Sequence, residues 1–222
     1  MRLDSIIDDI DSELPDSPRL RSGGSLLMMV GLPGTGKTSI VTSLQRLLPC
    51  VLVATDSIRA RIRQSPVYTA AEMMLVYEVC YAVIERRLQR GQRVVFDGSN
   101  HLAARREYLT VLAQRNGAPV AVCTVQAAQD VIRQRLAQRH RHGYSAKDKS
   151  DADWMVYQWM VEAQEPVVGE HLILDTTATS PDVLAAQLSK YWLEVETAAA
   201  SDPDLQSLGW AGKLGRVHGT RR

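Results

Sequence analysis

Gly31-Leu-Pro-Gly-Thr-Gly-Lys37-Thr38 is the stretch that decides the fold, and it follows the apolar run Leu26–Val30. It fits the pattern G-x-x-x-x-G-K-[ST] at every position. Its glycines allow a tight turn in which successive backbone N–H groups point inward, toward phosphate oxygens. A helix that opens at Gly36–Thr38 adds the positive end of its dipole. The stretch therefore predicts a phosphate-binding loop between a buried strand and a helix.

Each residue of this loop has an expected role at a bound nucleoside triphosphate. The Lys37 ammonium would reach the β- and γ-phosphates, and the Thr38 hydroxyl would bind Mg²⁺. The alternative is a glycine-rich turn with a chance Lys-Thr pair, but the strand before it and the helical pattern 39–48 after it favour the nucleotide site. The expected nucleotide-binding residues are Gly31, Leu32, Pro33, Gly34, Thr35, Gly36, Lys37, Thr38 and Ser39.

The 222 residues and the net charge of +1 fit one α/β domain with short tails. Acidic residues dominate positions 1–20, whereas 209–222 holds four basic residues and no acid. Such termini are usually solvated, and contact of the basic tail with nucleic acid is the weaker alternative. We expect an acidic lead-in over 1–24, partly helical or disordered, a domain over 25–195 and a flexible basic tail over 196–222.

Cysteine usage and hydropathy indicate the compartment. Cys50, Cys80 and Cys123 lie far apart inside apolar patterns, so we expect buried free thiols and no structural zinc. No apolar run approaches the ~20 residues that a bilayer requires. The first residues lack the basic start and apolar core of a signal peptide. We expect a cytoplasmic protein that does not enter a membrane.

Short apolar runs alternate with amphipathic segments along the rest of the chain. The expected strands are 26–30, 51–54, 93–97, 120–125 and 171–175, and the expected helices follow the loop to about 48, begin near 56, and cover 69–90, 103–114, 130–139, 154–164 and 181–193. The Met and Tyr side chains of 69–90 are expected to pack in the core. This β-α alternation predicts a three-layer α/β fold of the P-loop NTPase type, with a five-stranded, mostly parallel sheet and helices on both faces.

Polar residues follow the second and third expected strands. Asp56 and Arg59 come one helical turn apart after 51–54, and Asp97 ends 93–97. The carboxyl ends of parallel strands meet at the edge of the sheet where ligands bind. Asp56 is expected to accept the proton of an acceptor hydroxyl, and Asp97 to hold Mg²⁺ through water or to orient a substrate hydroxyl. Helix capping is the alternative role of both carboxylates.

A basic segment, 133–139, precedes a polar stretch around Gly143. Arg135 and Arg139 fall on one helix face, where they are expected to stabilise charge on a transferring phosphoryl group. The alternative is a solvated basic face. The polar stretch favours a mobile loop, so we expect a small arginine-rich lid over about 139–152.

These motifs together resemble the polynucleotide-kinase-like branch of P-loop kinases. The resemblance is carried by the loop, D-x-x-R at 56–59, V-V-F-D-G-S-N at 94–100 with Arg105 and Arg106 behind it, and R-L-x-x-R at 135–139. The branch includes the phage-type 5′-polynucleotide kinases and, more distantly, the zeta-toxin kinases. The resemblance covers about 26–193 and leaves no room for the separate phosphatase domain of the phage-type enzymes.

The resemblance implies an adenylate-kinase-like fold and an ATP-dependent kinase that uses Mg²⁺ and transfers the γ-phosphate to a hydroxyl. It implies that Asp56 is the general base and that Arg59 contacts a phosphate of the acceptor. The acceptor would be a nucleic-acid 5′-hydroxyl or a phosphate-bearing small molecule, with a nucleotide-sugar or a small metabolite as alternatives. The implied catalytic residues are Lys37, Asp56, Arg135 and Arg139; the implied substrate-binding residues are Asp56, Arg59, Asp97, Asn100 and Arg105; the metal ligands would be Thr38 and, through water, Asp97.

An ATP-hydrolysing switch and a non-catalytic nucleotide-binding module are the alternatives from other classes. A GTPase would need an N-K-x-D motif, and no Asn-Lys pair occurs in the chain. It would also need D-x-x-G after the third strand, where Asn100 stands instead of glycine. The presence of Asp56 disfavours a module without turnover. The oligomeric state cannot be read from the sequence.

Overall fold

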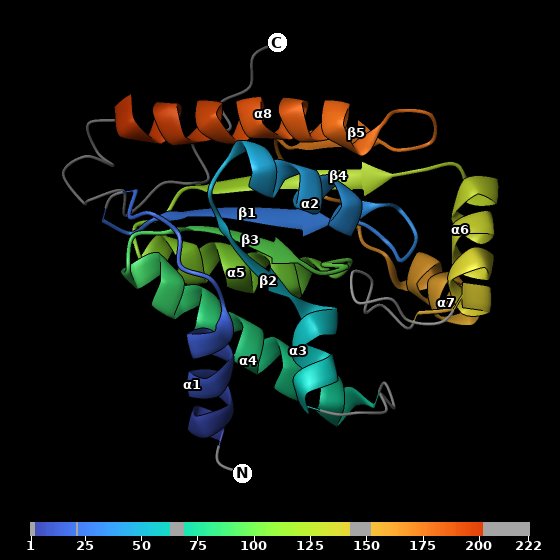
Figure 1. Cartoon of the computed structure of the whole chain (residues 1–222), viewed down its shortest axis with the longest axis horizontal. Coiled ribbons are helices and arrows are strands. Elements are labelled where there is room, and N and C mark those ends of the chain that lie inside the picture. Colours follow the sequence, from blue (N-terminus) through green and yellow to red (C-terminus); the bar gives the residue numbers. More distant parts are fainter. Residues whose placement is uncertain (1–2, 21, 63–68, 143–151, 202–222) are drawn as a thin grey trace.

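The computed structural model describes residues 3–20, 22–62, 69–142 and 152–201, with the backbone alone for 140–142 (Figure 1). One sheet has the strand order β2-β3-β1-β4-β5, and every neighbouring pair is parallel. Its strands are β1 (Ser25–Val30), β2 (Val51–Ala54), β3 (Arg93–Asp97), β4 (Val120–Gln126) and β5 (Leu172–Asp175). The predicted five-stranded α/β fold is confirmed, and its sheet is parallel throughout.

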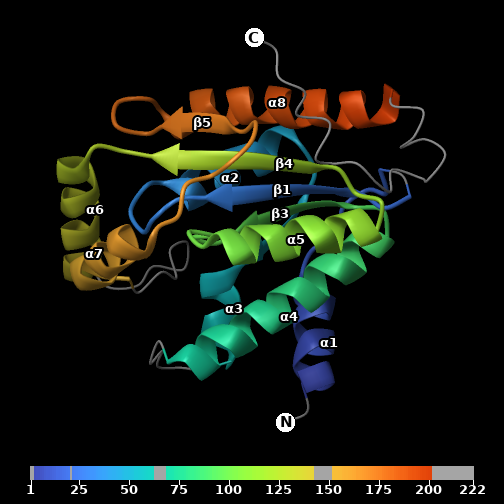
Figure 2. The same ribbon diagram turned by 180° about the vertical axis from the view of Figure 1, so that it is seen from behind.

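Helices cover both faces of this sheet, which lies between α8 on one side and α4 and α5 on the other (Figure 1, Figure 2). They are α1 (Leu3–Glu13), α2 (Lys37–Leu47), α3 (Thr55–Ile62), α4 (Ala70–Gln89), α5 (Ala103–Arg115), α6 (Gln129–His142), α7 (Trp154–Ala163) and α8 (Pro181–Ser201). Within the described ranges, no helix is both long enough and apolar enough to cross a bilayer.

The two faces of the central strand build two separate cores. Leu26, Met28 and Val30 pack with residues of α1, α4 and α5. Leu27 and Met29 point the other way and pack with residues of α2 and α8. Because side chains alternate along a strand, a continuous apolar run buries both faces of a parallel sheet. All six residues of β1 are buried, so the strand places the loop that follows it rigidly.

The last helix is longer than the sequence pattern predicted. It runs to Ser201 rather than to about Leu193, so residue 195 lies inside it. Trp192, Val195 and Ala199 continue its buried face, and the Trp192 indole donates a hydrogen bond of 2.7 Å to the Ser25 hydroxyl. The buried stripe continues past Leu193, where the sequence predicted the end of the helix. The tail expected over 202–222 lies outside the described residues.

The acidic N-terminal segment forms helix α1, as the helical alternative for 1–24 predicted, but one face of it is packed rather than solvated. Ile7 and Ile10 join the core, and Asp11 is buried. Asp11 Oδ1 accepts a hydrogen bond of 2.6 Å from Arg87 Nε on α4, and the side chain of Arg87 is only 2% exposed. Asp8 and Asp11 of α1 are therefore matched to arginines of α4, more than sixty residues away in sequence, a pairing that α1's own sequence does not reveal.

The three cysteines are buried free thiols, as predicted. Burial raises the pKa of the Cys50 thiol to about 12, and it raises the pKa of Cys80 and Cys123 as well. A thiol that stays protonated at neutral pH is a poor nucleophile. We therefore assign the cysteines to packing rather than to catalysis.

Candidate active site

The glycine loop joins β1 to α2, and two of its glycines adopt backbone angles that other residues avoid. Gly34 has φ of +80° and Gly36 has φ of +92°. A Cβ atom at Gly36 would lie only 3.3 Å from the Thr176 side chain. The loop therefore needs glycine there for conformation and for space.

Lys37 is the first residue of α2, and its ammonium lies across the loop. Nζ donates hydrogen bonds of 2.8 Å to the Gly31 carbonyl and 3.1 Å to the Leu32 carbonyl. Burial lowers the pKa of Lys37, whereas the negative charges of Asp97 and Asp56 oppose this shift and Arg139 adds to it. The loop thus holds a desolvated cation whose charge Asp97 and Asp56 favour, ready to exchange carbonyl oxygens for phosphate oxygens.

A cavity of about 590 Å³ opens beside the loop, at the carboxyl ends of β2 and β3. In Figure 1 this is the end of the sheet that faces α3, α6 and α7. Pro33, Gly34, Gly36 and Ser39 contribute to its wall from the loop and the start of α2. The wall also holds Lys37, Thr38, Asp56, Arg59, Asp97 and Arg139, so the structure brings together the predicted residues of four separate motifs.

Thr38 and Asp97 form a pair of oxygen ligands in this wall. The Thr38 hydroxyl donates a hydrogen bond of 2.7 Å to Asp97 Oδ2. Parallel pairing of β3 with β1 places Asp97 level with Met29, just before the loop. The capping alternative for Asp97 is wrong, because α5 begins after Leu102 and its first N–H is bound by the Glu165 carboxylate. A hydroxyl and a carboxylate are oxygen donors of the kind that Mg²⁺ prefers, so this pair fits the expected metal.

Asp56 lies in the first turn of α3 and not at its cap, because the helix already begins at Thr55. Its Oδ1 accepts a hydrogen bond of 2.8 Å from Arg59 Nη1. The side chain of Asp56 is 35% exposed, whereas that of Arg59 is only 6% exposed. Glu72 of α4 lies 3.5 Å from Arg59 Nε and is almost fully buried. Arg59 therefore lies between two carboxylates, and the sequence did not indicate the second one.

The two predicted arginines of α6 have different surroundings. Arg135 donates to the Gly34 carbonyl at 3.2 Å, to the Thr176 hydroxyl at 2.8 Å and to the Thr176 carbonyl at 2.8 Å. It therefore joins α6, the loop and the segment after β5, so it is not part of a solvated basic face. Arg139, one turn further along, lines the cavity. Residues 143–151 of the expected lid lie outside the described residues.

Asn100 shapes the turn after β3 from behind the cavity wall. It has φ of +45° and is fully buried. Its Nδ2 donates a hydrogen bond of 2.7 Å to the Met29 carbonyl, and the Ser99 carbonyl accepts one of 3.0 Å from the Gly31 N–H. Arg106 holds the same turn through the Asn100 and His101 carbonyls. The structure thus gives Asn100 a contact with the strand before the loop and does not bring its side chain into the cavity.

Several cavity residues were not anticipated from the sequence. Met73 and Tyr77 of α4 line the cavity together with Ser99 and Met160. Tyr77 belongs to the core, as expected, and it also lines the cavity. A Met–Tyr spacing of four residues on an amphipathic helix is the same for core packing and for a substrate wall, so no signal in the sequence separated the two.

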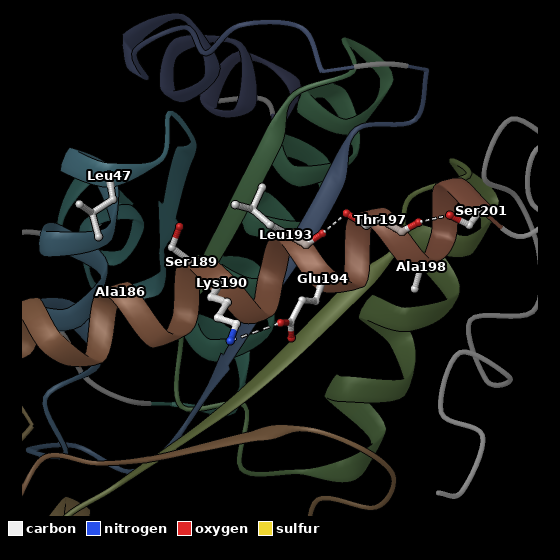
Figure 3. A pocket seen from close by; sticks show the side chains of 9 residues that line it. All are labelled: Leu47, Ala186, Ser189, Lys190, Leu193, Glu194, Thr197, Ala198 and Ser201. Carbon is white, nitrogen blue, oxygen red and sulfur yellow. Dashed lines mark hydrogen bonds and ion pairs between the residues drawn. The ribbon is translucent and has the colours of Figure 1, made fainter.

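A larger hollow of about 730 Å³ lies elsewhere, on the outer side of α8 beside Leu47 (Figure 3). Its polar side chains have partners within α8 itself: Lys190 Nζ lies 3.9 Å from Glu194 Oε1, and the Thr197 hydroxyl donates to the backbone carbonyl of Leu193. None of the predicted site residues lines it. The chemistry therefore belongs to the smaller cavity at the glycine loop.

The parallel sheet, the glycine loop at the end of its central strand and the Thr38–Asp97 pair define a P-loop protein of the α/β class. The chain belongs to the family AAA_33, described as an AAA domain, which matches residues 26–166. A comparison with curated proteins gives no match.

Solved structures with the same fold include several kinases. Kti12 of Chaetomium thermophilum in complex with ADP-AlF3 has a TM-score of 0.60 at 17% identity, over 77% of this chain and 98% of its own. The APS kinase CysC of Mycobacterium tuberculosis, in complex with AMPPNP and APS, has a TM-score of 0.57 at 16% identity, over 77% and 98%. A gluconokinase of Sinorhizobium meliloti 1021 has a TM-score of 0.54 at 19% identity, over 80% and 96%. The fold is that of P-loop kinases.

Proposed function

We propose that this protein is an ATP-dependent kinase that transfers the γ-phosphate of ATP to the hydroxyl of an acceptor. The observation that carries the proposal is the place of Asp56, a partly exposed carboxylate in the wall of the cavity that also contains the glycine loop. Its negative charge opposes the lowering of the Lys37 pKa by burial, and both residues line the same cavity. A carboxylate beside a γ-phosphate site is what an acceptor hydroxyl needs when it gives up its proton.

The donor half of the reaction is assigned to the loop. Its backbone N–H groups and Lys37 would bind the phosphates of ATP, and Lys37 would leave the Gly31 and Leu32 carbonyls to do so. Thr38 and Asp97 would hold Mg²⁺, which when bound neutralises charge on the phosphate oxygens. Arg139, in the wall of the same cavity, would stabilise the charge of the transferring group. Arg135 supports the loop through its contacts with Gly34 and Thr176.

The acceptor half is assigned to Asp56 and its neighbours. Arg59 binds Oδ1 of Asp56, which fixes the carboxylate and leaves Oδ2 to accept the proton. The family resemblance favours a nucleic-acid 5′-hydroxyl or a phosphate-bearing small molecule. Nucleotide-sugars and small metabolites are the alternatives, and the APS kinase and gluconokinase among the solved structures are both named for small acceptors.

The test is transfer from γ-labelled ATP to DNA and RNA 5′-hydroxyl ends, nucleosides, nucleotides, sugars and nucleotide-sugars. Asp56→Asn should lower the transfer rate by about 10²–10⁴-fold, the usual scale for a removed general base, with ATP affinity little changed. Asn keeps an oxygen for Arg59, so the fold should persist. Lys37→Ala should abolish ATP binding, because the β- and γ-phosphates lose their cation.

Asp182→Asn is the matched control, since Asp182 is an exposed carboxylate in the wall of the same cavity. It should leave transfer unchanged. Wild-type rates in Asp56→Asn would refute the role of Asp56 as base. ATP hydrolysis without transfer to any acceptor class would instead support the hydrolysing switch.

A further inference from the structure

Glu72 is a buried carboxylate next to Arg59, a residue of the cavity wall. It lies in the first turn of α4, and its side chain is only 2% exposed. Taking a carboxylate out of water is costly unless a cation compensates its charge. The cation here is Arg59 of α3, whose Nε lies 3.5 Å from Glu72 Oε1. The buried charge of Glu72 is therefore tied to the side of the cavity where Asp56 lies.

Helix capping accounts for the backbone of Glu72 but not for its side chain. Thr69 and Glu72 have the spacing of a capping box, and the Glu72 N–H donates a hydrogen bond of 3.2 Å to the Thr69 hydroxyl. In a complete capping box the glutamate side chain turns back to the N–H of the capping residue. Here Glu72 Oε1 is directed at Arg59 on the neighbouring helix, so the carboxylate links α4 to α3.

Each of the three guanidinium nitrogens of Arg59 faces a different neighbour. Nη1 donates a hydrogen bond of 2.8 Å to Asp56 Oδ1, Nη2 lies 3.4 Å from Met73 Sδ, and Nε lies 3.5 Å from Glu72 Oε1. An arginine side chain carries about 2 kcal/mol of rotamer entropy, so contacts from a second helix are needed to keep it in one orientation. Met73 and Glu72 supply these contacts from α4, and the guanidinium in turn binds the carboxylate of Asp56.

Bound phosphates would compete for Arg59. It lines the cavity that also contains the glycine loop, so phosphate groups in this cavity would attract its charge. If Arg59 moved toward them, it would release Asp56 Oδ1 and leave that carboxylate free to turn. A misplacement of about 1 Å at a reacting group can cost about 10²-fold in rate. The negative charge of Glu72 opposes this movement, because Glu72 does not line the cavity and attracts Arg59 toward α4.

We propose that Glu72 is a positioning residue of the kinase site: it holds Arg59, and through Arg59 it keeps the Asp56 carboxylate in the orientation that accepts the proton of the acceptor hydroxyl. This rests on the proposed kinase function. Arg59 then acts on Asp56 rather than on a phosphate of the acceptor, the role that the family resemblance implied. Arg105, which the resemblance also assigned to the substrate, does not line the cavity, and its guanidinium carbon lies 3.8 Å from the centre of the Tyr77 ring.

The first test is Glu72→Gln, which removes the charge and keeps the size of the side chain. In transfer from γ-labelled ATP it should lower kcat by about 10–100-fold, because the base is no longer fixed. The KM for ATP and for the acceptor should change by less than about threefold, since the groups that bind both substrates stay in place. An unchanged kcat in this variant would overturn the proposal.

Glu78→Gln is the matched control, because Glu78 is an exposed glutamate on the same helix. It should change none of these constants. Glu72→Asp keeps the charge on a shorter side chain and should retain part of the kcat that Glu72→Gln loses, and it replaces Glu72→Gln if that variant does not fold. A double-mutant cycle with Asp56→Asn then separates positioning from general support of the fold: once Asp56 is replaced, Glu72→Gln should lower kcat by less than about threefold. An equal loss in both backgrounds would overturn the proposal.

Side-chain NMR of the protein saturated with AMPPNP and Mg²⁺ separates this proposal from the kinase function itself. Exchange of the Arg59 Nε proton with water should be slow in the wild type and about tenfold or more faster in Glu72→Gln, since a guanidinium that loses a buried partner opens to water more often. Arg59→Lys identifies the signal. Slow exchange that depends on Glu72, without phosphorylation of any acceptor, would mean that the kinase function alone fails. Transfer by the wild type, together with exchange that does not depend on Glu72, would refute the positioning role and leave the kinase function standing.

Discussion

Arg135 allows the clearest separation between a catalytic and a structural role. The sequence motif assigned it to the transferring phosphoryl group, but the structure shows three hydrogen bonds from its guanidinium to Gly34 and Thr176. Arg135→Ala removes all three. At roughly 1 kcal/mol for each net hydrogen bond, the free energy of unfolding should fall by about 3 kcal/mol.

Urea unfolding measures this loss. With a slope of about 2 kcal/mol per molar urea, the midpoint should fall by about 1.5 M. Because Gly34 belongs to the glycine loop, the Kd for AMPPNP should also rise, by about tenfold. Arg133→Ala is the control, since Arg133 is exposed on the same helix and packs on Trp154, with its guanidinium 5.5 Å from the ring centre. It should shift stability by less than about 1 kcal/mol.

The opposite pattern would refute this reasoning. If Arg135→Ala kept its stability and its AMPPNP affinity but lost transfer by about 10²-fold or more, the guanidinium would act on the transition state. The contacts with Gly34 and Thr176 would then be a resting arrangement that the bound nucleotide replaces.

Two further predictions concern stability. Burial, with the positive charges of Arg105 and Arg106 nearby, lowers the pKa of folded His101 to about 4, below the unfolded value of about 6.5. As the pH falls the unfolded state therefore takes up the proton first, so the free energy of unfolding should fall by about 3 kcal/mol between about pH 6.5 and 4. His101→Phe should flatten this dependence of the unfolding free energy on pH, measured by urea titrations. Arg87→Met leaves the buried Asp11 without its main partner and should cost about 3–5 kcal/mol by chemical denaturation, whereas Arg86→Met, at an exposed pair with Asp8, should cost less than about 1 kcal/mol.

The strands could be predicted closely because each is a short apolar run with a clear boundary. β2 and β3 begin and end where the sequence placed them, and β1 differs by one residue. The end of α8 was missed, because its buried stripe continues past Leu193 through Val195 and Ala199. How far this helix extends depends on the surface that its buried face packs against, and that surface comes from other parts of the chain.

Helix α1 illustrates the same limit for charged residues. A run of carboxylates is compatible with a solvated segment and with a segment that meets arginines elsewhere. Arg87 of α4 decides between the two, because its Nε lies 2.6 Å from Asp11 Oδ1 and both side chains are buried. Complementary charges far apart in sequence leave no local pattern, so only the fold could reveal this pairing.

The amino-acid sequence by itself determined the donor half of the site. Glycines at Gly34 and Gly36, Lys37 and Thr38 act through backbone conformation and local order, and the strand before them and the helix after them suffice to place these residues. Asp56 and Asp97 were predicted for a similar reason, since each lies at the carboxyl end of a short strand and parallel strands end at a common edge.

Only the tertiary structure decided which role each arginine has. Arg59, Arg105, Arg135 and Arg139 are alike as residue types, but their roles depend on what lies within about 4 Å of each guanidinium. Glu72, Tyr77 and Thr176 come from α4 and from the segment after β5, brought there by the order of the strands. Hydrogen bonds and charge interactions act over a few ångströms of space rather than along the chain, so the acceptor side of the site became visible only once the sheet was folded.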